Sequence, residues 1–206
     1  MADSETTRQR FTWALPALAA VAVAAVVVAG AAPAANGPAV EIRAFKPVAD
    51  TYVTAVHPRR NFGRARILRV DGAPETTAYL RFELRKLQAS ITSVTLLMHP
   101  STAARARFAV RRVYEDEWRE RRLTYANAPR PSPRYTASKP VRSGAWSAID
   151  VTQFVDGTGA VTLAITARGN GEVSFGSRES RHGPRLVVRT EEDGVDDLVR
   201  EALLQH

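Results

Sequence analysis

The sequence contains no cysteine, which excludes disulfide bonds, cysteine-ligated zinc sites and thiol catalysis. Its four histidines lie far apart and show no HExxH or similar metal-ligand spacing. Lysine is also scarce, because only Lys46, Lys86 and Lys139 among the 29 basic residues are not arginine. Arginine side chains suit planar anions such as carboxylate, sulfate and phosphate. Arginine-rich codon usage would give the same composition, so composition alone leaves both explanations open.

The chain has 206 residues, which is enough for a short export segment and one ordinary domain that needs no cross-links. Hydrophobic residues make up 45% and charged residues 24%, which is typical of a globular protein and not of a disordered one.

Residues 1–35 carry the features of an export segment. Two arginines precede residues 11–35, which have no charge and an alanine- and valine-rich centre, and Ala32 and Ala34 fit the A-x-A cleavage rule. An apolar stretch of about 20 residues also spans a bilayer, so an uncleaved membrane-anchor helix is the alternative. We expect a signal peptide or anchor, a linker over residues 36–44, and a body outside the cell, either secreted or held at the membrane.

The body alternates apolar and polar residues with the period of β-strands. In residues 79–84 every second side chain, from Leu80 to Leu84, is apolar. The same alternation recurs near residues 94–98, 108–110, 149–151, 161–165, 173–175 and 186–188. Turns rich in glycine, proline and aspartate separate these stretches, and no helical run lies between them. About nine such strands predict an all-β fold, an antiparallel β-sandwich of jelly-roll type over residues 45–190.

Two segments depart from this alternation. Residues 115–135 are polar and contain three prolines, which predicts a long crossing loop with one helical turn. Residues 191–206 carry six acidic residues against one arginine, with apolar residues at helical spacing. They predict a short acidic amphipathic helix, with a frayed tail as the alternative. By difference residues 41–190 carry a net charge of +13, so the tail could dock on this basic body or on a protein partner.

Several short motifs in the body resemble the DNRLRE domain. In chain order they are Asp50-Thr51-Tyr52-Val53, Asn61-Phe62-Gly63, Tyr79-Leu80-Arg81-Phe82, Trp118 to Pro129, and Ser174-Phe175-Gly176-Ser177-Arg178. Their order and spacing cover nearly the whole body. The DNRLRE domain is similar to carbohydrate-binding module family 96. The resemblance implies a jelly-roll β-sandwich, export, and non-catalytic binding of an acidic, uronate-type polysaccharide.

An acidic glycan would need arginines for its carboxylates and exposed aromatic rings for its sugar faces. Arginines at every second position of a strand could follow a polyanionic chain. These two criteria select the candidate ligand-binding residues Tyr79, Arg81, Arg105, Arg107, Arg111 and Tyr125. For any single arginine, an ordinary solvated position is the competing interpretation. The Arg59–Arg69 stretch holds a further group of five arginines.

Other polar residues near the motifs are expected to form a structural network. They are Asp50, Asn61, Trp118, Asn127, Asp150 and Arg178. Trp118 is expected to anchor the long loop, and Arg178 to pair with a carboxylate such as Asp50 or Asp150. Asp50, Asn61 and Asp150 could also hold a structural calcium ion, although no EF-hand pattern is present. No other cofactor is expected.

Three other functions compete with glycan binding. A scaffold or adhesion domain that binds another protein would use the same fold without a binding groove. A polysaccharide lyase would need a base beside an arginine, such as Tyr79 with Arg81 or His99 with Arg111. No paired acidic spacing points to glycoside hydrolysis. Nucleic acid would suit the charge, but export argues against it and no recognition motif is present.

Overall fold

The computed structural model describes residues 39–87, 89–101 and 106–191. The predicted signal or anchor segment and the tail beyond Glu191 lie outside these ranges. Within the ranges, no helix has the length and apolar character that crossing a membrane requires.

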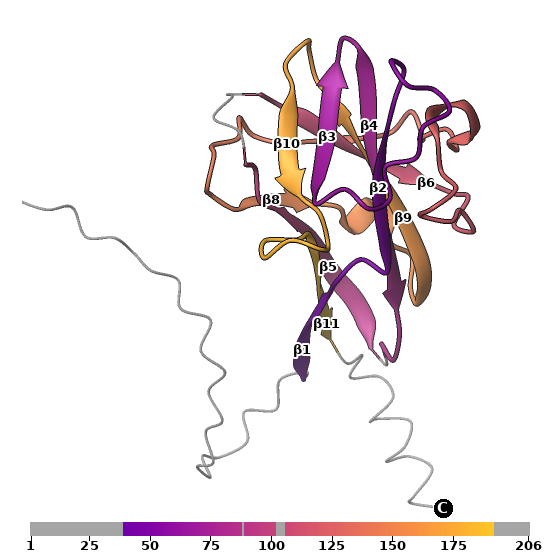
Figure 1. Ribbon diagram of the computed structural model, residues 1–206. Helices are drawn as coiled ribbons and strands as arrows, with labels where there is room; N and C mark the ends of the chain where they lie inside the picture. The colour runs from indigo at the N-terminus through magenta and orange to yellow at the C-terminus, as the bar shows by residue number, and fades with distance from the viewer. Residues whose placement is uncertain (1–38, 88, 102–105, 192–206) are drawn as a thin grey trace, which may run out of the picture. The chain divides into compact units, whose positions relative to one another are not determined.

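Two antiparallel sheets make up the described domain (Figure 1). The four-stranded sheet has the order β1-β11-β5-β8, with bounds Val40–Phe45, Arg185–Glu191, Ser90–Met98 and Ser147–Asp150. The second sheet has the order β10-β3-β4-β9-β6-β7, and β2 also pairs with β4. Its strands in chain order are β2 (Ala49–Thr54), β3 (Ile67–Gly72), β4 (Glu75–Leu84), β6 (Phe108–Val113), β7 (Thr136–Ala137), β9 (Gly159–Ala167) and β10 (Val173–Gly176). Two single-turn 3₁₀ helices, η1 (Tyr125–Asn127) and η2 (Thr152–Phe154), complete the fold.

The chain passes repeatedly from one sheet to the other, as in a jelly roll. Strand β4 lies in the larger sheet, β5 in the smaller, β6 and β7 in the larger, β8 in the smaller, β9 in the larger and β11 in the smaller. This connectivity confirms the predicted all-β, antiparallel, jelly-roll sandwich.

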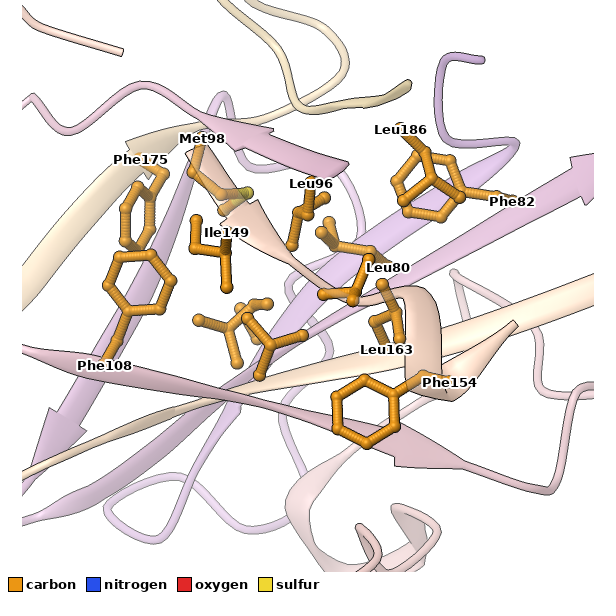
Figure 2. Packing of buried hydrophobic residues seen from close by; sticks show 14 of the residues in the cluster. Leu80, Phe82, Leu96, Met98, Phe108, Ile149, Phe154, Leu163, Phe175 and Leu186 are labelled. Atoms are coloured by element: carbon orange, nitrogen blue, oxygen red, sulfur yellow. The ribbon is translucent and has the colours of Figure 1, made fainter. Parts of the chain in front are cut away.

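The core fills the space between the sheets with the apolar residues that alternate in the sequence. Leu80, Phe82, Leu96 and Leu186 are all fully buried there. Figure 2 shows these side chains from both sheets pointing toward one another. Phe108 and Phe175 meet edge to face with ring centroids 5.0 Å apart. One face of each strand is therefore committed to the core, and functional groups must come from the outer faces and the loops.

A second, smaller apolar cluster lies on the outer side of the larger sheet. Tyr79 and Val113 from strands β4 and β6 pack there against Trp118 and Leu123. The last two residues belong to the 115–135 segment, which is the predicted long loop and contains the predicted helical turn as η1. The loop thus covers part of a sheet face that the sequence pattern suggested was exposed.

The predicted linker over residues 36–44 is wrong in its second half, because residues 40–44 belong to β1. This strand pairs with β11 from Val40 opposite Glu191 to Phe45 opposite Leu186. Without it, β11 would present an unpaired edge. Strand β1 and the two-residue strand β7 were not predicted, so the structure describes eleven strands where about nine were expected.

Candidate functional site

Tyr79 is not an exposed stacking platform, and that expectation from the strand alternation is wrong. Its side chain is only 3% exposed, and its hydroxyl donates a 2.8 Å hydrogen bond to the carbonyl of Pro129. Burial raises the pKa of Tyr79 above its usual range. Trp118 contacts the ring edge to face at 6.2 Å. Tyr79 therefore attaches the 115–135 loop to the sheet.

Arg81, the neighbour of Tyr79 on β4, also holds this loop. Its Nη1 donates to the carbonyls of Asp116 (3.0 Å) and Trp118 (2.7 Å), and its guanidinium lies 5.5 Å from the centre of the indole. Trp118 is 8% exposed, and its Nε1 donates to Thr162 Oγ1 at 3.1 Å. These contacts use the guanidinium of Arg81 inside the protein and leave little of it for a ligand.

Of the predicted row of arginines near β6, the structure describes Arg107 and Arg111. Arg105 lies outside the described residues, and Arg107 is exposed just before the strand. Arg111 donates through Nη1 to the carbonyls of Ser132 (3.0 Å) and Pro133 (2.8 Å). Its guanidinium also lies 4.9 Å from the ring centre of Tyr135, as does that of Arg168. Arg111 therefore holds the end of the long loop.

The remaining candidates in the long loop make local contacts. The hydroxyl of Tyr125 donates to Glu75 Oε2 at 2.7 Å, which ties η1 to β4. Asn127 accepts from the backbone N–H of Thr124 at 2.7 Å and donates to the carbonyl of Arg122 at 3.0 Å. Both residues thus shape the loop.

A polar network joins Asp50 on β2, Glu120 in the long loop, and Arg178 and Glu179 after β10. The Arg178 guanidinium pairs with Glu120 and Glu179, each at 3.0 Å from its Nε. Its Nη1 donates to the carbonyl of Val48 at 2.7 Å. Asp50 instead accepts the backbone N–H of Arg178 at 2.6 Å. The Arg178 guanidinium therefore pairs with carboxylates, but these are Glu120 and Glu179 and not the suggested Asp50 or Asp150.

Asp50 is an almost completely buried carboxyl group, with 2% exposure. Burial raises its pKa to about 7, and the charges of Glu179 and Glu120 act in the same direction. The hydrogen bond from the Arg178 backbone opposes this shift. The group is therefore protonated for much of the time at neutral pH.

Asn61 and Gly63, from the Asn61-Phe62-Gly63 motif, dock the β2–β3 loop onto the long loop. The Asn61 amide donates to the carbonyls of Glu120 and Leu123, both at 2.7 Å. A Cβ on Gly63 would stand 2.3 Å from the Glu120 carbonyl oxygen, so only glycine fits without movement. The motif therefore fixes the position of Phe62 between these two residues.

The residues expected for a calcium site do not come together. Asp50 and Asn61 both contact Glu120, whereas Asp150 lies on β8 and accepts from Thr152 Oγ1 at 2.6 Å. Among the described residues, Asp50, Glu120 and Glu179 bring carboxylate oxygens within 4.8 Å of one another. The Arg178 guanidinium already supplies a positive charge to that group.

Arginines and aromatic rings converge in a groove that the candidate residues did not include. This groove of about 450 Å³ is lined by Tyr52, Thr54, Val56, His57, Arg60, Phe62, Arg69, Asp71, Pro74, Thr76 and Glu172. Phe62 stacks on Tyr52 at 4.3 Å between ring centres, and the Arg60 guanidinium lies 5.1 Å from the centre of the Phe62 ring. Its signal in the sequence is the group of arginines at 59–69, of which Arg60 and Arg69 line the groove.

A second hollow adjoins this groove and shares Arg60 and Phe62 with it. It is lined by Arg60, Asn61, Phe62, Arg64, Ala65 and Arg121. No acidic side chain lines it. The two hollows together form one surface, which we call the β2–β3 groove.

Comparison with known proteins supplies the family. A model of carbohydrate-binding module family 96 matches residues 41–190, which is well over half of the chain. Comparison with curated proteins finds no match. The matched range coincides with the described sandwich from β1 to β11. The chain belongs to carbohydrate-binding module family 96.

Proposed function

We propose that this protein is an exported, non-catalytic module that binds an acidic polysaccharide through the β2–β3 groove. The observation that carries the proposal is the meeting of Arg60, Phe62 and Arg64 in two adjoining hollows. Family membership supports a carbohydrate ligand, and the charge of the groove supports an acidic one.

The groove offers both kinds of contact that an acidic sugar needs. Phe62 is partly exposed and is held in place by stacking on Tyr52, which suits the apolar face of a pyranose ring. Arg60, Arg64 and Arg121 form no ion pair within the described part of the chain. Their guanidinium groups are therefore available to a carboxylate.

The first hollow is less basic than the second. Arg69 lies 3.8 Å from Glu172 there, and Asp71 also lines the wall. This part suits the hydroxyl groups of a sugar, which need donors as well as acceptors. The second hollow, with three arginines and no acid, suits the carboxylates of the same chain.

The face around Arg81 and Arg111 fits a structural role better. Their guanidinium groups bond to loop carbonyls, and Tyr79 and Trp118 are buried beneath the loop. A lyase is disfavoured for a related reason. Tyr79 is buried and the Arg81 guanidinium bonds to loop carbonyls. His99, just after β5, stacks on His182, while Arg111 bonds to the carbonyl of Ser132.

The test is affinity electrophoresis against polyuronates and neutral glycans at low and moderate salt. We expect retardation by polyuronates that survives moderate salt, and its loss in Arg60→Gln, Arg64→Gln and Phe62→Ala. Loss of one charge-assisted contact weakens binding by about tenfold or more.

Arg142→Gln is the matched control, because Arg142 is exposed and lies outside both hollows. It removes the same charge and should leave the retardation unchanged. Equal weakening by Arg142→Gln and Arg60→Gln would mean that a diffuse basic surface binds the glycan. Absence of retardation by every glycan would favour the scaffold function.

A further inference from the structure

We infer that a pocket separate from the β2–β3 groove binds one compact tetrahedral oxyanion, either sulfate or phosphate. It lies between the β1–β2 connection and the β10–β11 loop and has a volume of about 50 Å³. Its lining residues are Lys46, Pro47, Arg178, Ser180, Arg181, Gly183, Pro184 and Arg185. None of them lines the β2–β3 groove, so this inference does not depend on the proposed function.

All the charged side chains that line this pocket are basic. Lys46, Arg181 and Arg185 form no ion pair within the described residues. No acidic side chain is part of the lining. Arg178 differs, because Glu120 and Glu179 neutralise its guanidinium. Three positive charges without partners therefore surround one small space.

Like charges gathered in this way repel one another, and an anion between them would remove the repulsion. A doubly charged oxyanion balances three cations better than a single carboxylate does. The arginine guanidinium groups match its oxygen atoms with paired N–H donors.

The size of the pocket sets a limit on the ligand. The pocket's volume of about 50 Å³ compares with about 450 Å³ for the first hollow of the β2–β3 groove, so the pocket favours a compact group over a sugar ring. A sulfate or phosphate group, free or attached to a sugar that remains outside, fits this limit.

The wall of the pocket is held in one conformation. Ser180 donates from its backbone and from its Oγ to the Ser177 carbonyl, at 2.9 and 2.7 Å. A Cβ on Gly183 would stand 2.9 Å from the same oxygen, so the loop is closely packed. The Arg178 bond to the Val48 carbonyl fastens the loop to the β1–β2 connection. These contacts hold the backbone of the loop that carries Arg181 in place before any ligand arrives.

The test is isothermal titration calorimetry of the purified chain with sodium sulfate and with sodium phosphate. Sodium chloride keeps the ionic strength constant. We expect saturable binding at one site per chain. Arg181→Gln and Arg185→Gln should each weaken it by about tenfold, because each removes a charge-assisted contact. Both side chains are exposed, so far-UV circular dichroism should show an intact fold.

Arg130→Gln is the control for loss of one charge, since Arg130 is exposed in the long loop and outside the pocket. It should change the affinity by less than about twofold. Glucose 6-sulfate and glucose 6-phosphate tell the sources apart: binding like that of the free ions indicates a sugar-borne group, and binding of the free ions alone indicates a free anion. Heat that does not saturate, or equal weakening by Arg130→Gln, would overturn the inference.

Discussion

The Arg178 guanidinium lies with its Nε 3.0 Å from Oε1 of Glu120, joining two segments that are 58 residues apart in the chain. This contact fastens the 115–135 loop to the turn after β10. The same loop residue accepts the backbone N–H of Asp50 on β2 and, through its carbonyl, the amide of Asn61. Glu120 therefore contacts three separate segments: the turn after β10, strand β2 and the β2–β3 loop. The β2–β3 loop carries residues of the β2–β3 groove.

Replacement of Arg178 by alanine should lower the free energy of unfolding by about 2 kcal/mol. It leaves the carboxylates of Glu120 and Glu179, which are 14% and 35% exposed, without their positive partner. The Arg178 side chain is itself 35% exposed, so solvent limits the loss. Urea unfolding monitored by tryptophan fluorescence measures it.

Arg85→Ala serves as the comparison for that experiment. The Arg85 side chain is 78% exposed and lies 3.6 Å from Glu83, so its removal should change stability by less than about 0.5 kcal/mol. Similar losses for the two variants would mean that Arg178 acts only as a surface charge.

The stability of the domain should fall as the pH rises from about 4 to about 7, through the titration of Asp50. Burial raises the pKa of Asp50 from 3.8 to about 7, so within this window the folded state holds a proton that the unfolded chain releases. The stability that this proton contributes is fully present below the pKa of Asp50 in the unfolded chain. It is lost as the pH rises through the pKa of Asp50 in the folded state. Through this one group the free energy of unfolding changes by at most about 1.4 kcal/mol per pH unit.

Asp50→Asn isolates this effect from other titrating groups. The asparagine carbonyl can still accept the Arg178 backbone N–H, but it does not titrate. Urea unfolding at several pH values should give a wild-type curve that declines relative to the variant between pH 4 and 7. Two parallel curves would contradict the buried, protonated state.

Tyr79→Phe should cost about 1 kcal/mol of stability, because it removes the bond to the Pro129 carbonyl and leaves the ring in place. Glycan binding should not change, since the ring is buried beneath the loop. Urea unfolding and affinity electrophoresis of the same variant test both statements. Weaker glycan binding at unchanged stability would restore Tyr79 as a binding residue.

Gly63→Ala should destabilise the domain by about 1–3 kcal/mol, the usual cost of overpacking. The new Cβ would stand 2.3 Å from the Glu120 carbonyl oxygen, and backbone must move to make room. Since the movement displaces Phe62, glycan retardation should fall as well.

Gly171→Ala is the matched substitution, because its Cβ would meet only Ala106 Cβ at an ordinary 3.7 Å. Thermal unfolding of the two variants, with electrophoresis beside it, compares them directly. A Gly63→Ala variant as stable as Gly171→Ala would show that the motif glycine is not needed for the loop contact.

Most of the fold could be predicted from the sequence because strand alternation is a local property. The side chains from Leu80 to Leu84 repeat with period two, and burial follows this repeat wherever a strand has a core on one side only. The motifs around Asn61 and Trp118 identified the family for the same reason, since each is a short run of neighbouring residues.

The proposed binding surface could not be predicted in this way. Alternation places Tyr79 and Arg81 on the outer face of β4, but only the folded chain decides whether that face meets solvent or the 115–135 loop. The β2–β3 groove likewise depends on stacking of Phe62 on Tyr52 and on the approach of Arg121 from the loop. The sequence by itself determined most of the strands, their inner faces and the excess of arginine. The tertiary structure alone decided which arginines are neutralised by neighbours and which face a groove, because contacts between distant segments set both burial and pairing.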